Sequence, residues 1–118
     1  MRMDLKFALP ILLLLLAPGG AAAHAMLDRA EPRVGSTVHA PPHEVSLWFS
    51  QNIEGATSTT TVTDAGGRRV DAGKPAISGN VMRVPLQGVG AGTYRVRWHV
   101  LSVDTHTTQG SFTFRVGE

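Results

Sequence analysis

The chain contains no cysteine among its 118 residues. This absence excludes disulfide bonds and a cysteine-linked lipid anchor. It also excludes metal sites that need thiolate, such as zinc ribbons, iron–sulfur clusters and blue-copper centres. A strong excess of charge is missing too, because the formal net charge is only +2. The basic residues are scattered and only Arg68-Arg69 are adjacent, so nucleic-acid binding is not expected.

Signatures of hydrolytic or transfer chemistry are also missing. The sequence has neither a G-x-S-x-G nucleophile elbow nor a phosphate-binding glycine loop. Glu31, Glu44 and Glu54 show no pairing of carboxylates for acid–base catalysis. The one long hydrophobic run, Phe7–Ala17, is about half of the roughly 20 residues that span a bilayer.

The first 23 residues have the pattern of a secretory signal peptide. Arg2 and Lys6 precede the apolar run, and small residues end the segment at Ala21-Ala22-Ala23, an A-x-A cleavage site. Cleavage there would leave residues 24–118 as one exported, soluble domain, which we expect in the periplasm. A second A-x-A site, Ala23-His24-Ala25, would instead start the mature chain at Met26. The local sequence leaves both cleavage sites open.

The first cleavage site would make His24 the mature N-terminus. The α-amine and the imidazole Nδ1 of an N-terminal histidine can chelate one metal ion together, which no internal histidine can do. Loss of His24 by the second cleavage would remove this ligand.

The rest of the chain has the pattern of short strands separated by turns. Alternation of apolar and polar residues is clearest in Thr93–Val103, where Arg95, Arg97 and His99 share the polar side. Several such strands separated by glycine and proline predict an all-β sandwich with Greek-key connections and no long helix. The remaining predicted strands are Glu44–Ser50, Ser58–Thr63 with a continuation at Arg69–Val70, Val81–Leu86 with Pro85 at a sheet edge or strand end, and Ser111–Val116.

Two of the five histidines stand out as metal ligands. His39, His43 and His99 are expected to be exposed and without a function. His106 follows Asp104 by two residues, and side chains at this spacing in extended backbone project to one side. The ordinary alternative is that Asp104 starts a turn and His106 is an exposed turn residue.

The possible ligands are an α-amine, two imidazoles and one carboxylate, from His24, His106 and Asp104. A set of nitrogen donors with one oxygen suits Cu(II), followed by Ni(II), and Zn(II) can use the same donors. Cu(I) prefers sulfur, but only Met26 and Met82 would remain after cleavage. We therefore expect oxidised copper.

Residues 24–118 resemble the CopC family of bacterial extracytoplasmic copper-binding proteins. The resemblance begins at His24-Ala25 and is most specific near the C-terminus. Its other motifs are Ala30-Glu31-Pro32-x-x-Gly35-Ser36, Pro42–Ser50, Val62-Thr63-Asp64, Gly92-Thr93-Tyr94-x-Val96-x-Trp98-x-Val100-x-Ser102 and Asp104-x-His106-x-x-x-Gly110-Ser111-Phe112-x-Phe114.

The resemblance implies an immunoglobulin-like or cupredoxin-like β-sandwich with a Cu(II) site. The N-terminal His24 would bind through its amine and Nδ1, with Asp104 and His106 as the other ligands, and this favours cleavage before His24. Thr105, Thr107 and Trp98 are candidates for supporting or packing roles.

Two departures from the family pattern matter. Some members have a methionine-rich loop that binds Cu(I), whereas Val62–Asn80 has no methionine. Some also have a glutamate near Cu(II), where this chain has Gln51, so Asp104 is the expected oxygen donor.

We therefore expect a monomeric, exported protein that sequesters, buffers or delivers copper. A membrane copper transporter is a candidate partner. One alternative is a histidine-brace copper enzyme that oxidises polysaccharides, with Trp48, Trp98 and Tyr94 as the only aromatic residues for sugar stacking. Another is a metal-free interaction module.

Overall fold

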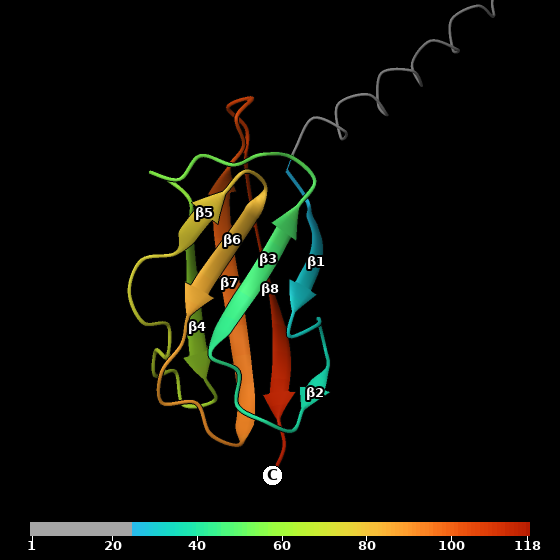
Figure 1. Cartoon of the computed structure of the whole chain (residues 1–118), viewed down its shortest axis with the longest axis vertical. Helices are drawn as coiled ribbons and strands as arrows, with labels where there is room; N and C mark the ends of the chain where they lie inside the picture. The colour runs from blue at the N-terminus through green and yellow to red at the C-terminus, as the bar shows by residue number, and fades with distance from the viewer. Residues whose placement is uncertain (1–24) are drawn as a thin grey trace, which may run out of the picture.

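The computed structural model describes residues 25–118, and all regular structure in this range is β-strand. Two four-stranded sheets form a sandwich (Figure 1). The first has the order β1 (Leu27–Glu31), β3 (Glu44–Phe49), β6 (Val81–Pro85) and β5 (Ala76–Ser78). The second has the order β2 (Thr37–Val38), β8 (Thr107–Val116), β7 (Gly92–Leu101) and β4 (Thr59–Asp64).

The predicted all-β sandwich is confirmed. The chain crosses between the sheets after β1, β2, β3, β4 and β6, and every strand pair is antiparallel except β2 with β8. Within residues 25–118 there is no helix long and apolar enough to cross a membrane.

The predicted strands β3, β4, β6 and β7 are present with small shifts at their ends. Pro85 ends β6, which lies inside its sheet between β3 and β5, so the strand-end alternative is the correct one. The continuation at Arg69–Val70 is wrong, because only the isolated bridges Thr63–Arg69 and Asp71–Leu86 form there.

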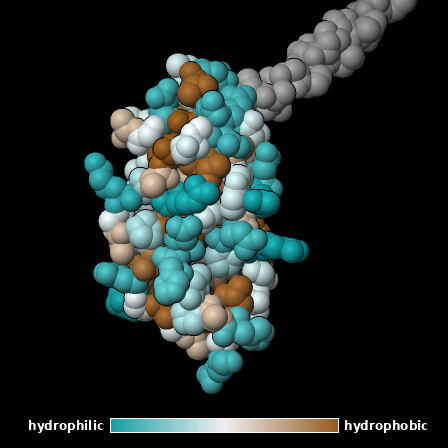
Figure 2. All heavy atoms as spheres, in the orientation of Figure 1, coloured by the Kyte–Doolittle hydropathy of each residue, from teal (hydrophilic) through white to brown (hydrophobic). Residues whose placement is uncertain are grey.

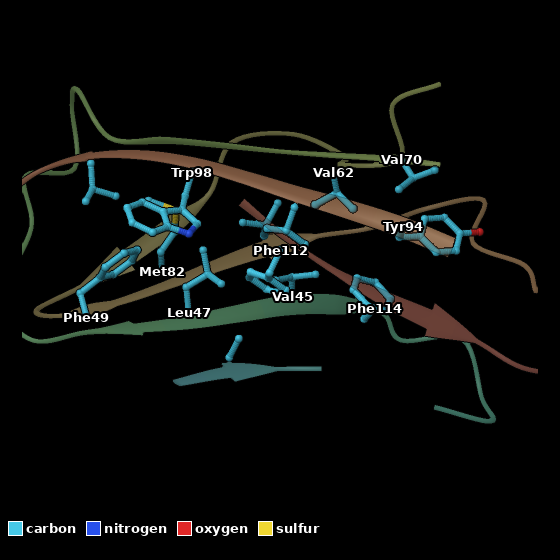
Figure 3. Packing of buried hydrophobic residues seen from close by; sticks show 14 of the residues in the cluster. Val45, Leu47, Phe49, Val62, Val70, Met82, Tyr94, Trp98, Phe112 and Phe114 are labelled. Atoms are coloured by element: carbon cyan, nitrogen blue, oxygen red, sulfur yellow. The ribbon is translucent and has the colours of Figure 1, made fainter. Parts of the chain in front are cut away.

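The core lies between the two sheets and is built by the alternation of each strand. In β7 the residues Tyr94, Val96, Trp98 and Val100 are buried, and the residues between them are exposed. Figure 3 shows Trp98 near Phe49 at one end of the core and Tyr94 beside Phe114 at the other. The first pair is T-shaped with ring centroids 5.4 Å apart, and the second is stacked at 5.5 Å. Burial of these rings together with the aliphatic side chains of the core favours folding.

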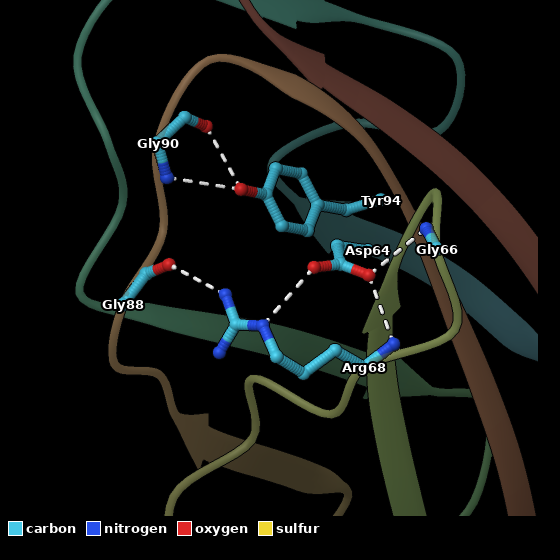
Figure 4. Close-up of polar contacts among 6 residues, drawn as sticks. All are labelled: Asp64, Gly66, Arg68, Gly88, Gly90 and Tyr94. Atoms are coloured by element: carbon cyan, nitrogen blue, oxygen red, sulfur yellow. Dashed lines mark hydrogen bonds and ion pairs between the residues drawn. The ribbon is translucent and has the colours of Figure 1, made fainter.

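Loops at the Tyr94 end are tied together by polar contacts (Figure 4). The Tyr94 hydroxyl accepts a hydrogen bond from the Gly90 amide at 2.9 Å and donates one to its carbonyl at 2.8 Å. Asp64 accepts from the amides of Gly66 and Arg68 and forms an ion pair with the Arg68 side chain at 3.3 Å. These contacts hold the end of the sandwich that lies away from the Asp104-x-His106 motif.

Candidate metal centre

The Asp104-x-His106 motif lies in the tight connection between β7 and β8. Leu101 pairs with Thr107 across the base of this connection, which projects beyond the sheets at the top of Figure 1. The Ser102 amide donates to the His106 carbonyl at 2.9 Å, and the Thr105 amide donates to the Ser102 carbonyl at 2.9 Å. Thr105 has φ +77°, a left-handed conformation that lets the chain reverse within so few residues.

This turn brings the two predicted ligands of the motif together. The His106 Nδ1 lies 3.4 Å from the Asp104 Oδ1, and the side chains are 52% and 36% exposed, respectively. Both groups are therefore close to each other and open to an ion from solution. The prediction of extended backbone at this motif is wrong, because Asp104 lies in a tight turn and accepts a hydrogen bond from the His106 amide, as the ordinary alternative has it. The turn nevertheless brings the two side chains together.

Asp104 is held by contacts that all fall on one carboxylate oxygen. Its Oδ1 accepts hydrogen bonds from the Ser102 hydroxyl and, at 3.4 Å, from the His106 amide. The Ser102 bond is the largest cause of a lowered pKa of Asp104, and the His106 contacts lower it further. The carboxylate stays ionised well below neutral pH, and its Oδ2 remains available to a cation.

The start of the described chain is fixed next to this connection. Ala25 is fully buried, and its carbonyl accepts a hydrogen bond from the Thr108 hydroxyl at 2.6 Å. Met26 is bound to Ser50 by two hydrogen bonds of 2.8 Å. The N-terminal end of the described chain thus lies beside β8. It is held there by Thr108, which is two residues after His106.

The remaining predicted site residue, His24, lies outside the described residues, as do the signal peptide and both cleavage sites. Within residues 25–118, no three side chains of the histidine, cysteine, aspartate or glutamate type converge on one point. Asp104 and His106 are therefore the two predicted ligands that the structure describes, and the third predicted ligand is not described. His39, His43 and His99 are exposed, as expected.

Sequence reasoning missed the roles of Ser102 and Thr108. Ser102 is fully buried and its hydroxyl also lies 3.1 Å from the His106 carbonyl oxygen, so it contacts both halves of the motif. Alternation along β7 does indicate this residue, because it places Ser102 on the buried side after Trp98 and Val100. A buried hydroxyl two residues before a carboxylate could have indicated that Ser102 contacts Asp104. The contact between Thr108 and Ala25 joins distant parts of the sequence and depends on the fold.

The chain matches the model of the CopC domain over residues 27–117. It is 34% identical over 117 residues to protein YobA of Escherichia coli K12, and the match covers 96% of this chain and 94% of that protein.

Solved structures agree with the family assignment. CopC from Methylosinus trichosporium OB3b superposes with a TM-score of 0.75 and 28% identity, covering 80% of this chain and 94% of that one. PcoC, a methionine-rich copper resistance protein from Escherichia coli, superposes with a TM-score of 0.70 and 31% identity, covering 79% and 98%. The fold, the motif at the β7–β8 connection and these matches together show that the chain belongs to the CopC family of copper-binding resistance proteins.

Proposed function

We propose that this protein is exported, loses residues 1–23, and binds Cu(II) at the end of the sandwich where β7 meets β8. In this proposal the α-amine and Nδ1 of His24 chelate the ion, His106 supplies a second imidazole, and Asp104 supplies a charged oxygen through Oδ2. Three nitrogens and one oxygen match the preference of Cu(II) for tetragonal N and O ligands.

The observation that carries the proposal is the fixed position of Ala25. Consecutive Cα atoms are 3.8 Å apart, so a buried Ala25 restricts the reach of the residue before it. The carbonyl of Ala25 is hydrogen-bonded to Thr108, which lies two residues from His106. An N-terminal histidine in this place would have the Asp104–His106 pair within its range.

The methionines support a site for Cu(II) without a separate Cu(I) site. Met82 is fully buried, and its sulfur accepts a hydrogen bond from Thr60 at 2.8 Å. Met26 is 53% exposed but has no methionine neighbour in the sequence. PcoC is described as methionine-rich, and this chain lacks that feature.

The aromatic residues support a binding protein and not a polysaccharide-oxidising enzyme. The Arg29 guanidinium covers the Trp48 ring at 3.9 Å from its centroid. Trp98 and Tyr94 belong to the core, with 9% and 4% of their surfaces exposed. A flat, uncovered ring for stacking on sugars is therefore missing from the chain's tryptophans and tyrosine.

Copper binding by this set must compete with protons. The donor nitrogens bind only when deprotonated, and an α-amine titrates near pH ~7.7–8.0. Cu(II) affinity should therefore fall as the pH drops below neutrality. We propose that the bound copper is stored, buffered or passed to a membrane transporter by a monomeric protein in the periplasm.

The test compares two purified proteins, one that begins at His24 and one with a single glycine before it. Cu(II) affinity is measured by competition with a chelator, and a glycine added after Glu118 serves as the matched control. We expect the N-terminal glycine to weaken binding by more than the roughly 10–100-fold that loss of an outer contact costs. Equal affinity of the two proteins would show that the N-terminus is not a ligand.

A further inference from the structure

The outer surface of the β2-β8-β7-β4 sheet carries unpaired positive charge. We call it the basic face and define it by Arg95, Arg97 and Arg115, by His99 in the same row of β7, and by the hydroxyl and amide residues around them. Strand register places these neutral residues directly beside the cations, and they are Thr59, Thr61, Thr63, Thr93, Gln109, Ser111 and Thr113. Among residues 25–118, no aspartate or glutamate forms an ion pair with a basic residue of this face.

The three arginines contact only neutral hydroxyl groups. Arg95 donates to Ser111 at 3.3 Å, Arg97 to Thr63 at 3.4 Å, and Arg115 to Thr93 at 2.7 Å. None of them takes part in an ion pair within residues 25–118. Because a guanidinium has five N–H donors, each arginine keeps donors for a carboxylate.

The opposite face of the sandwich has a different charge pattern. There Arg83 lies 3.8 Å from Glu44 in an ion pair, and Arg29 stacks on Trp48. Figure 2, which views this side, shows hydrophilic and hydrophobic residues mixed over the surface. On that side one arginine has a carboxylate partner and the other an aromatic partner, whereas the side-chain hydrogen bonds of the basic-face arginines are with hydroxyl groups.

The basic face is hollowed on both sides of Arg97. One hollow of about 480 Å³ includes Thr61, Arg97, His99, Gln109 and Gly110. Trp98 also lines this hollow, and it pairs with Gly110 across β7 and β8. A second hollow of about 380 Å³ is lined by Arg95 and Arg97 and also by Asp64, whose carboxylate forms an ion pair with Arg68. Each hollow has room for a side chain next to a guanidinium.

We propose that the basic face docks an acidic, extended segment of a partner protein, with aspartate or glutamate at alternate positions. Arg95 and Arg97 are two positions apart in β7, which corresponds to about 6–7 Å along the backbone of the strand. Carboxylates at alternate positions of an extended segment have the same spacing, and arginine binds carboxylates through paired hydrogen bonds.

Two other kinds of partner fit this face less well. Nucleic-acid binding commonly uses about 6–10 phosphate contacts, and this face offers three arginines. Binding to a membrane surface needs apolar side chains that enter the lipid. The exposed large hydrophobic residues Met26, Val34 and Val103 all lie outside the basic face.

The position of the basic face connects it to the β7–β8 turn. His99 pairs with Gln109, and Leu101 pairs with Thr107 two residues further along the same two strands. A partner docked on the face would therefore reach the connection that holds Asp104 and His106. The docking itself depends only on charge and shape, and it stands whether or not the copper proposal holds.

The test is a titration of metal-free ¹⁵N-labelled protein, in EDTA and low salt, with a blocked peptide of alternating glutamate and threonine. We expect amide shifts confined to β4, β7 and β8, which weaken as salt is added. The variant R95Q/R97Q should bind at least about tenfold more weakly. The control R83Q removes one positive charge from the opposite sheet and should bind like the unaltered protein.

Three outcomes would overturn the proposal. One is the absence of shifts in β7, and another is equal weakening by R83Q and by R95Q/R97Q. The third is tighter binding of the same face to a DNA duplex or to phosphatidylglycerol vesicles than to the peptide. Thermal melting of each variant checks its fold, and R115Q at the far end of the face provides a second, independent variant.

Discussion

At the residue scale, Ser102 is a buried side chain that contacts both residues of the candidate metal centre in the described part of the domain. Its hydroxyl contacts a carboxylate oxygen of Asp104 and the carbonyl of His106 while being fully buried. Groups that orient metal ligands commonly change metal affinity 10–100-fold when they are lost. Ser102 thus links the core to a site on the surface.

We predict that S102A lowers Cu(II) affinity by roughly 10–100-fold and the free energy of unfolding by about 1 kcal/mol. The first value is measured by chelator competition and the second by urea denaturation. The control is S36A, since Ser36 likewise bonds a nearby carbonyl, that of Arg33 at 2.7 Å, but lies in a loop away from the site. An S102A protein with unchanged copper affinity would remove Ser102 from the site.

At the element scale, β8 depends on a glycine opposite a tryptophan. Gly110 pairs with Trp98 of β7, and a Cβ at this position would lie 2.6 Å from Cζ2 of the ring. The ring is also packed edge-on against Phe49. The indole therefore has little freedom to move away.

G110A should accordingly destabilise the protein by about 1–3 kcal/mol, the usual cost of overpacking. The midpoint of urea denaturation measures this effect. G90A is the matched control, because a Cβ at Gly90 would have no neighbour within 4 Å. Equal stability of the two variants would contradict the prediction, because it would mean that the Trp98 ring can move away from a Cβ at position 110 without cost.

The element scale also shows why some strands escaped prediction. β1 is irregular, with a register shift between Leu27 and Arg29, and only Ala30 of its five residues is buried. β2 has two residues and β5 has three. Alternation needs several residues to be visible, so these strands form because neighbouring strands offer hydrogen bonds and not because of a local pattern.

At the scale of the whole molecule, stability at low pH depends on carboxylates that tie loops to the sheets. Asp71 is an example, because its side chain accepts from the Val62 amide of edge strand β4 at 2.9 Å and forms an ion pair with Arg69 at 2.6 Å. Burial raises the pKa of Asp71, but the contacts with Arg69 and Val62 outweigh this and leave it below the usual 3.8. A lowered pKa stabilises the folded state above the unfolded value, and this contribution is lost as the pH falls through the folded value.

We therefore expect D71N to lose less stability than the unaltered protein between pH 7 and pH 3. Urea denaturation at both pH values gives the difference. D28N is the control, since Asp28 is exposed and takes part in no ion pair within the described domain. An identical loss in the unaltered protein and D71N would mean that another group controls the acid response.

The sequence by itself determined the all-β class, the main strands and the Asp104–His106 pair. Alternation in β3, β4 and β7 is a local property, because successive side chains of a strand point to opposite faces. The two predicted ligands of the motif are also a local feature, since they are only two positions apart. His24 as a ligand remains a prediction from the signal-peptide pattern and the family resemblance.

Only the tertiary structure decided which distant residues support these features. Ala25 meets Thr108 across 83 positions of sequence. The basic face forms because register aligns the exposed arginines of β7 with hydroxyl groups of β4 and β8, and Arg115 of β8 with Thr93 of β7. Contacts of this kind depend on the order and register of strands in a sheet. Since register is set by the packing of the whole core, a linear pattern of residues does not reveal them.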